Sequence, residues 1–386
     1  MTLPMPVDEH ANRVAKARSL MAKANVDALI VTDPVTYGYF TGNRVPAWMK
    51  ARPSIFILPA SGEPALITWS GPQMFARLYN KPFPSWVQDK VIYPDVPFTR
   101  EPRTDWGIHG VLADRGLTKG RLAIEMGRNT WLGIPLNDFT LLREQAPQAE
   151  FVDSSEIVWG CRMIKSEWEV ACLEHVCVIG QKAWYAVLEE VQVGMTPREV
   201  QQRILQRYLE FGADIDSGPP MAMGANGPSG TFQKGDILYL DGGPAFQGYQ
   251  MDITRRAVFG TPSERQRHEH EEMWDIMFEV IDRMKPGVSM TELFEFSSKR
   301  MAQVKGWRDY ADHPAKRIGH GIGLESEPPS MSAVDETLLA EGMVLTPEPK
   351  LESVDGLVNP EEQVAVTATG CRLLSDDTGG RLIVIE

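Results

Sequence analysis

The chain has 386 residues, of which 43% are hydrophobic and 24% are charged, and these fractions are typical of a folded protein with a sizeable core. At about 100–200 residues per domain, this length predicts two or three domains. The 52 acidic and 39 basic residues give a net charge of −13. Because nucleic acids and anionic membrane surfaces repel such a protein, we expect neither as a partner.

Two further features concern the cellular location. No stretch has the ~18 unbroken apolar residues of a membrane-spanning helix, and residues 1–15 lack the basic start and apolar run of a signal peptide. We therefore expect a cytoplasmic protein. The cysteines form no Cys-x-x-Cys pair, which excludes a zinc ribbon and disfavours a disulfide framework. We expect small core residues at all four positions, Cys161, Cys172, Cys177 and Cys371.

The first part of the chain, residues 1–160, alternates helical and strand-like patterns. An amphipathic helix is predicted over 10–24. The stretch 81–103 contains five prolines and is typical of an irregular surface loop. The alternation predicts an α/β domain with a mixed sheet. Its strands are predicted at 28–31, 55–58, 65–68 and 122–125.

The second part, residues 161–386, carries repeated helix-start patterns. Ser166 and Thr196 each stand three residues before a Glu, which is the spacing of a capping box, and Ser289 repeats it. Two of these copies share the pattern Gly-x-Ser/Thr-x-x-Glu, and each follows a long amphipathic helix. This predicts a duplicated domain with helices on one curved sheet. The alternative is that helix starts look alike because capping chemistry is common.

Two carboxylates lie on a predicted hairpin. Asp241 ends the apolar strand 237–240, and Asp252 enters the next strand eleven residues later. Burying two carboxylates side by side is costly unless a cation or a shared proton compensates. Taken alone, such a pair more often includes a simple turn residue.

Three further residues have comparable positions. His320 stands between glycines that allow close backbone approach, Glu348 follows an apolar strand between two prolines, and Glu361 enters an alternating strand. Each has an ordinary structural explanation when considered alone. Together with the two aspartates they supply four carboxylates and one imidazole, which balance two divalent cations and suit manganese, iron, cobalt or zinc. Two such ions can polarise a substrate group and stabilise developing negative charge.

The order Asp, Asp, His, Glu, Glu in these contexts resembles the pita-bread metallopeptidase family, which includes aminopeptidase P, prolidase, methionine aminopeptidase and creatinase. The resemblance covers the chain from Ser166 onward closely and the first part more loosely. It implies an α+β fold with a pita-bread catalytic domain over 161–386, built from duplicated helices on a curved antiparallel sheet. A smaller creatinase-type α/β domain over 1–160 precedes it.

The resemblance also implies roles for the five residues. Asp252 and Glu361 bridge two metal ions, Asp241 binds one ion, and His320 and Glu348 bind the other. Glu348 is in addition the implied general base. The family is usually dimeric, so we expect a homodimer in which the neighbour's N-terminal domain closes the substrate pocket. Candidate substrate-binding residues are Arg44, Trp48 and Arg52, whose alternative is a solvated loop, and Tyr249 beside Asp252.

Several peptidase features are missing. The stretch 224–231 is short and lacks the family's substrate-binding His, Glu327 replaces the second His, and Asn359 replaces an Arg. These residues stabilise the tetrahedral intermediate in the peptidases, so their loss disfavours proline-peptide cleavage. The segment from His320 to Glu327 looks more like the non-peptidase branch, which includes dimethylsulfoniopropionate lyases. Glu327 is then a candidate base or a ligand for a cationic group, and its alternative is an ion pair.

Three enzymatic readings follow. The first is a metal-dependent hydrolase of an amide or C–N bond in a small amino-acid-derived substrate, including an Xaa-Pro dipeptide. The second is a metal-dependent lyase acting on a small zwitterion. The third, a creatinase-like metal-independent hydrolase, is less favoured because all five metal positions are present. Retention of this set also argues against a non-catalytic binding module.

Overall fold

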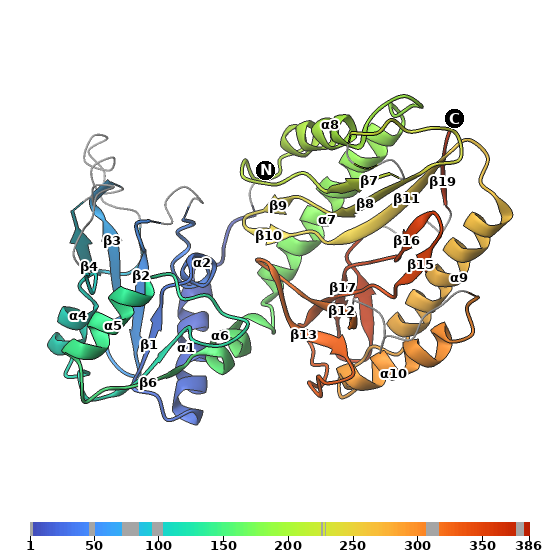
Figure 1. Cartoon of the computed structure of the whole chain (residues 1–386). Coiled ribbons are helices and arrows are strands. Elements are labelled where there is room, and N and C mark those ends of the chain that lie inside the picture. Colours follow the sequence, from blue (N-terminus) through green and yellow to red (C-terminus); the bar gives the residue numbers. More distant parts are fainter. Residues whose placement is uncertain are drawn as a thin grey trace. The chain divides into compact units, whose positions relative to one another are not determined.

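Figure 1 shows the computed structural model of the chain. The structure describes residues 3–45, 51–71, 85–94, 103–224, 227, 229–305, 316–375 and 382–386. The chain divides into two units, one formed by residues 5–162 and the other by residues 1–4 with 163–386. Among the described residues, no helix is long and apolar enough to cross a membrane.

The unit 5–162 is built around a six-stranded mixed sheet in the order β4-β3-β2-β1-β5-β6. The pairs β3–β4, β1–β5 and β5–β6 are parallel, and β2 pairs antiparallel with both of its neighbours. The strands are β1 (Ala28–Val31), β2 (Ile55–Pro59), β3 (Ala65–Trp69), β4 (Asp89–Tyr93), β5 (Arg121–Ile124) and β6 (Glu150–Asp153). The helices are α1 (Glu9–Lys23), α2 (Pro34–Thr41), α4 (Ile108–Asp114), α5 (Leu136–Gln145) and α6 (Ser155–Arg162).

One prediction for this unit is wrong. The proline-rich stretch 81–103, expected to be an irregular loop, contains β4 at Asp89–Tyr93. This strand is the edge of the sheet and pairs parallel with β3. Val91 to Tyr93 is a β-branched and aromatic run, and Pro94 removes no hydrogen bond of this pairing because it lies just after the paired segment.

Among its described residues, the second unit contains two helix pairs, the two-stranded sheets β9–β10 and β15–β16, and two larger sheets (Figure 1). The larger sheets have the orders β19-β11-β8-β7 and β13-β12-β14-β17-β18, and their pairs are antiparallel except β11–β19. The helices are α7 (Glu167–Leu188), α8 (Pro197–Glu210), α9 (Glu264–Ile281) and α10 (Met290–Met301). The strands are β7 (Met221–Met223), β8 (Ile237–Gly242), β9 (Ala245–Phe246), β10 (Tyr249–Gln250), β11 (Ile253–Phe259), β12 (Arg317–Ile322), β13 (Ser326–Ser332), β14 (Val344–Pro347), β15 (Leu351–Ser353), β16 (Gly356–Val358), β17 (Val364–Val366), β18 (Cys371–Leu373) and β19 (Ile383–Ile385).

The predicted capping boxes open three of these four helices. At Ser166, Thr196 and Ser289, the side chain accepts from the backbone N–H three residues on, and the Glu there accepts from the cap residue's N–H. A fourth box at Ser263 opens α9 with Gln266 in place of Glu. Helices α7 and α8 pack with β8 and β11 in one core, and α9 and α10 pack with β12 and β14 in another. The duplicated helix-on-sheet arrangement is therefore confirmed.

The four cysteines are free thiols. Cys161, Cys172 and Cys177 are buried, as expected for small core residues. Cys371 differs, because it is only half-buried and lies 3.2 Å from the carbonyl oxygen of Ile281.

Candidate metal centre

The first two acidic residues come from one antiparallel pair of strands. Asp241 lies near the end of β8 directly opposite Thr254 of β11, and Asp252 immediately precedes β11. Leu238 and Leu240 point into the core below, so alternation turns Asp241 to the other face of the sheet. The chain thus delivers both aspartates to one end of this pair.

The imidazole comes from the second sheet. His320 lies on β12 opposite Thr346 of β14, and Glu348 follows β14 directly. Gly321 allows β13 to lie close to β12, because a Cβ atom at residue 321 would lie 2.3 Å from the carbonyl oxygen of Pro328. Glu361 precedes β17 and forms an isolated bridge with Thr254, which joins the two sheets at the site.

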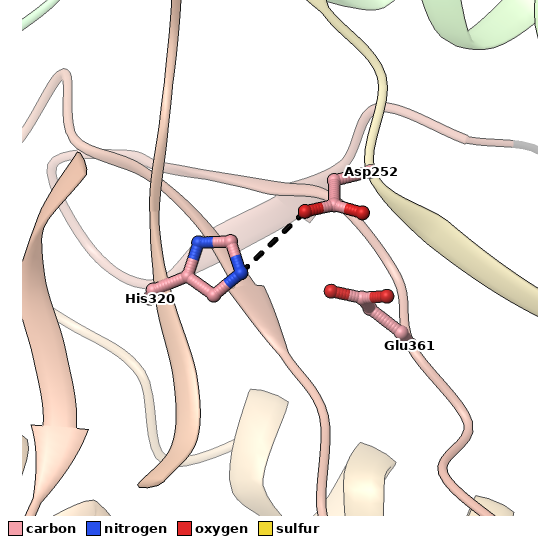
Figure 2. A group of neighbouring side chains, drawn as sticks. All are labelled: Asp252, His320 and Glu361. Carbon is pink, nitrogen blue, oxygen red and sulfur yellow. Dashed lines mark ion pairs between the residues drawn. The ribbon is translucent and has the colours of Figure 1, made fainter. Parts of the chain in front are cut away.

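Asp252, His320 and Glu361 each offer one ligand atom, and these three atoms lie within 4.8 Å of one another. Figure 2 shows both carboxylates directed toward the imidazole ring. His320 Nε2 lies 3.5 Å from Asp252 Oδ2. All three side chains are largely or fully buried. Two oxygens and one imidazole nitrogen at this spacing form a set that suits a divalent transition metal.

The imidazole is oriented by its other nitrogen. His320 Nδ1 lies 2.9 Å from the carbonyl oxygen of Gly321 and 3.1 Å from Ser326 Oγ. Because a carbonyl oxygen only accepts, Nδ1 carries the proton and Nε2 presents its lone pair to the carboxylates. Burial also lowers the pKa of His320, which favours the neutral ring that binds metals.

The carboxylates repel one another in this buried position. Burial, followed by the charges of Asp241 and Glu348, raises the pKa of Asp252 to about 7. Burial and the charge of Asp252 raise the pKa of Glu361 well above its usual value, and burial raises that of Asp241. A bound cation removes this repulsion. The residues present therefore fit a divalent metal ion.

Asp241 and Glu348 flank this three-residue group. Tyr239 donates a hydrogen bond of 2.6 Å to Asp241 Oδ2. Glu348 Oε1 lies 3.9 Å from His320 Nε2, and its carboxylate also contacts Lys350 and Arg317. The structure thus brings all five sequence-predicted ligands to one place, with three of them in the tight group.

Hydrogen bonds hold the two acidic segments together. The Thr254 N–H donates to the Glu361 carbonyl over 3.2 Å, and the Thr254 hydroxyl donates to Glu361 Oε2 over 3.1 Å. The Asp252 N–H donates to Gln363 Oε1 over 3.0 Å. Each metal-ligand segment therefore positions the other.

A buried ion pair lies behind these bonds. Arg255 Nη2 lies 2.7 Å from Glu362 Oε1, and both side chains are almost fully buried. Arg255 Nη1 also donates to the Glu361 carbonyl over 3.4 Å. Ser375 donates to the other oxygen of Glu362. Arg255 thereby connects the strand that follows Asp252 to the backbone of Glu361.

Two predicted site residues lie outside this group and have other partners. Glu327, proposed as a catalytic base, forms a buried ion pair with Lys165. Tyr249, proposed to bind substrate, is buried in the core and donates to Glu169 Oε1 over 2.7 Å. Its ring also packs edge-on against Trp168. Both contacts are with residues far away in sequence, and local sequence patterns do not reveal such contacts.

The predicted lid residues belong to the other unit. Arg52 is buried with its guanidinium over the Trp69 ring, 5.2 Å from the centroid, rather than on a solvated loop. Arg44 is exposed. Trp48 lies outside the described residues. Their role as a lid stays a prediction.

Residues 171–368 match metallopeptidase family M24, and residues 13–164 match the creatinase/prolidase N-terminal domain. The chain belongs to metallopeptidase family M24. This confirms the resemblance to the pita-bread metallopeptidases and the expected pairing of an N-terminal creatinase-type domain with a pita-bread domain.

Curated relatives of this M24 protein are hydrolases. It is 32% identical over 256 residues to the Xaa-Pro dipeptidase of Pyrococcus horikoshii, which covers 63% of this chain and 71% of the relative. It is 24% identical to the ectoine hydrolase of Halomonas elongata over 97% of both chains.

Solved structures show the same fold. The prolidase from Pyrococcus horikoshii OT3 superposes with a TM-score of 0.74 at 23% identity, over 95% of this chain and 98% of that one. The prolidase from Thermococcus sibiricus gives a TM-score of 0.80 at 22% identity, over 99% of this M24 protein and 100% of that chain.

Proposed function

We propose that this M24 protein is a metal-dependent hydrolase of an amide or C–N bond in a small amino-acid-derived substrate. The observation that carries the proposal is the group of Asp252, His320 and Glu361 within 4.8 Å. The curated relatives include a dipeptidase and an ectoine hydrolase, and both names describe hydrolysis. Manganese, iron, cobalt and zinc all suit this ligand set.

The site residues divide the chemistry among them. Asp252, His320 and Glu361 would hold the ion, which supplies Lewis-acid polarisation of the scissile carbonyl and activates water. Glu348 Oε1 would accept the proton of the attacking water as general base, because it lies 3.9 Å from His320 at the edge of the group. Asp241, held by the Tyr239 hydroxyl, adds negative charge that retains the cation.

The lyase alternative is distinguished from hydrolysis by its products. That reading used Glu327, whose carboxylate is paired with the buried ammonium of Lys165. Glu348, the base of the hydrolase reading, is paired in the same way with Lys350. The two lysine contacts therefore do not separate the two reactions.

The proposal is tested by product analysis. Chelator-treated protein is incubated with Xaa-Pro dipeptides, N-acyl amino acids and ectoine, with and without added Mn²⁺, and the products are identified by mass spectrometry. We expect a new amine and a new carboxylate only when metal is restored. An alkene product would establish the lyase instead. Full hydrolysis by chelated protein would establish the metal-independent enzyme.

An apolar surface adjoins Asp241 on the same face of the sheet. Met221 and Met223 of the edge strand β7 lie directly opposite Asp241 and Tyr239 of β8. Their side chains are 52% and 42% exposed, whereas Ala222 between them is buried in the core. Two flexible thioether side chains beside the metal ligands are suited to an apolar substituent of the substrate.

This arrangement predicts a substrate preference. Replacing Met221 and Met223 together by Ala should lower kcat/KM for a substrate with a large apolar side chain by about tenfold or more. The glycine analogue should change by less than about twofold, since it has no side chain to contact the methionines. The Met126→Ala variant removes a methionine of similar exposure from the other unit and should change neither value. Equal losses for both substrates would refute the apolar contact.

A further inference from the structure

One lysine lies within the metal centre. Lys350 Nζ is 2.6 Å from Glu348 Oε2, and only 11% of the Lys350 side chain is exposed. The same ammonium donates to the Glu348 carbonyl oxygen over 3.2 Å. Pro349, between the two residues, restricts the backbone that sets this contact. Lys350 is therefore a largely buried residue of the site and not a solvated surface side chain.

The charge of Lys350 acts on Glu348. Its ammonium lies 2.6 Å from Glu348 Oε2, and the other oxygen of Glu348 lies 3.9 Å from His320 Nε2. A positive charge at this position repels a metal ion bound by Glu348.

Glu348 is engaged on both oxygens. Its Oε2 atom binds Lys350, and its Oε1 atom lies 3.6 Å from Arg317 Nε. Among the residues that the structure describes, no lysine or arginine forms an ion pair with Asp252 or Glu361. The ion-pair distances of His320 are to the carboxylates of Asp252 and Glu348. Glu348 is the ligand least available to a second ion.

Charge balance also favours a single divalent ion in this centre. Asp241, Asp252, Glu348 and Glu361 provide four negative charges in a buried place. Lys350 and one divalent ion place three positive charges among them, and Arg317, whose side chain is 45% exposed, adds a solvated fourth at the edge. A second divalent ion would leave an excess of positive charge, which is costly away from water.

We propose that this centre holds one divalent ion per chain, bound by Asp252, His320 and Glu361, and that the Lys350 ammonium supplies beside Glu348 the positive charge that a second ion supplies in two-metal sites. This inference rests on the proposed metal-dependent function. It also assigns Lys350 as the residue that sets metal stoichiometry.

The test is a metal count. Chelator-treated full-length protein is equilibrated with Mn²⁺ by dialysis, and bound manganese per chain is measured by mass spectrometry. We expect one ion in the wild type and two in Lys350→Met, with the second ion bound at least about tenfold more tightly than in the wild type, since one close charge contact is removed. The Lys350→Arg variant keeps the charge and should bind one.

Two controls complete the design. The Lys316→Met variant removes an exposed lysine that lies just before β12 and should still bind one ion. Circular dichroism melting checks that each variant is folded, and Lys350→Gln replaces any Lys350→Met protein that is not.

Each outcome has a separate meaning. Two tightly bound ions in the wild type would overturn the inference but leave the proposed hydrolase intact. One ion in both the wild type and Lys350→Met would show that Lys350 does not set the stoichiometry. No bound ion in an active wild type would overturn the metal-dependent function itself.

Discussion

Replacing His320 by Ala is expected to lower kcat/KM for hydrolysis by on the order of 10³ and to weaken metal binding in parallel. The imidazole supplies the only nitrogen among the three closely spaced ligands of the described group, and its Nδ1 proton is already committed to Gly321. Its removal leaves Asp252 and Glu361 to hold the cation alone. Steady-state kinetics and Mn²⁺ titration of the chelated protein measure both effects.

A matched variant separates this effect from a general loss of folding. His175 on α7 packs edge-on against Phe246, at a ring distance of 4.5 Å, and contacts none of the predicted ligands among the described residues. The His175→Ala protein should retain activity and metal affinity. If His320→Ala kept wild-type kinetics, or if both variants lost activity equally, the assignment of the metal centre would be wrong.

Replacing Arg255 by Met is expected to lower the free energy of unfolding by about 3–5 kcal/mol. The substitution leaves the Glu362 carboxylate buried without its cation, and both side chains of the pair are nearly inaccessible to water. It also removes the donor to the Glu361 carbonyl, so metal affinity should fall as well. Denaturant unfolding with and without Mn²⁺ measures both quantities.

Two further variants of this chain make the prediction specific. The double variant Arg255→Met with Glu362→Leu removes both charges and should recover part of the lost stability. The Arg372→Met variant breaks an exposed pair with Glu174, whose side chains are 44% and 46% exposed, and should cost less than about 1 kcal/mol. Equal costs for Arg255→Met and Arg372→Met would contradict a special role for the buried pair.

Much of the fold follows from local sequence. The boxes at Ser166, Thr196 and Ser289 begin helices where the capping pattern predicts them, because both partners of each box lie within three residues. The strand β4 is missed because prolines on both sides suggested a loop. Its pairing with β3 depends on the rest of the sheet, which local patterns do not describe.

The sequence predicts the ligands of the candidate site but not all of their contacts. The four acidic residues lie at or near strand ends, and His320 lies within β12 between two glycines, which are positions that the sequence marks clearly. Alternation also places Thr254 on the face of Asp252, two residues away, which is a pattern that would have found it. Lys350 stands two residues after Glu348, but its contact depends on a backbone course that the sequence does not reveal.

Long-range partners account for the remaining differences. Glu327 pairs with Lys165 and Tyr249 with Glu169, and each pair is separated by many residues along the chain. Glu327 stands where the family has its second His, which suggested a catalytic role, and Tyr249 stands beside Asp252, which suggested substrate binding. Tertiary packing gives each of them a buried contact, and their roles at the site stay predictions.

The most direct test of the metal centre is an anomalous difference map from a crystal of the full chain grown with Mn²⁺. We predict a peak among Asp252 Oδ2, His320 Nε2 and a Glu361 carboxylate oxygen, the group drawn in Figure 2. A manganese peak elsewhere, or none in catalytically active crystals, would contradict the proposed centre.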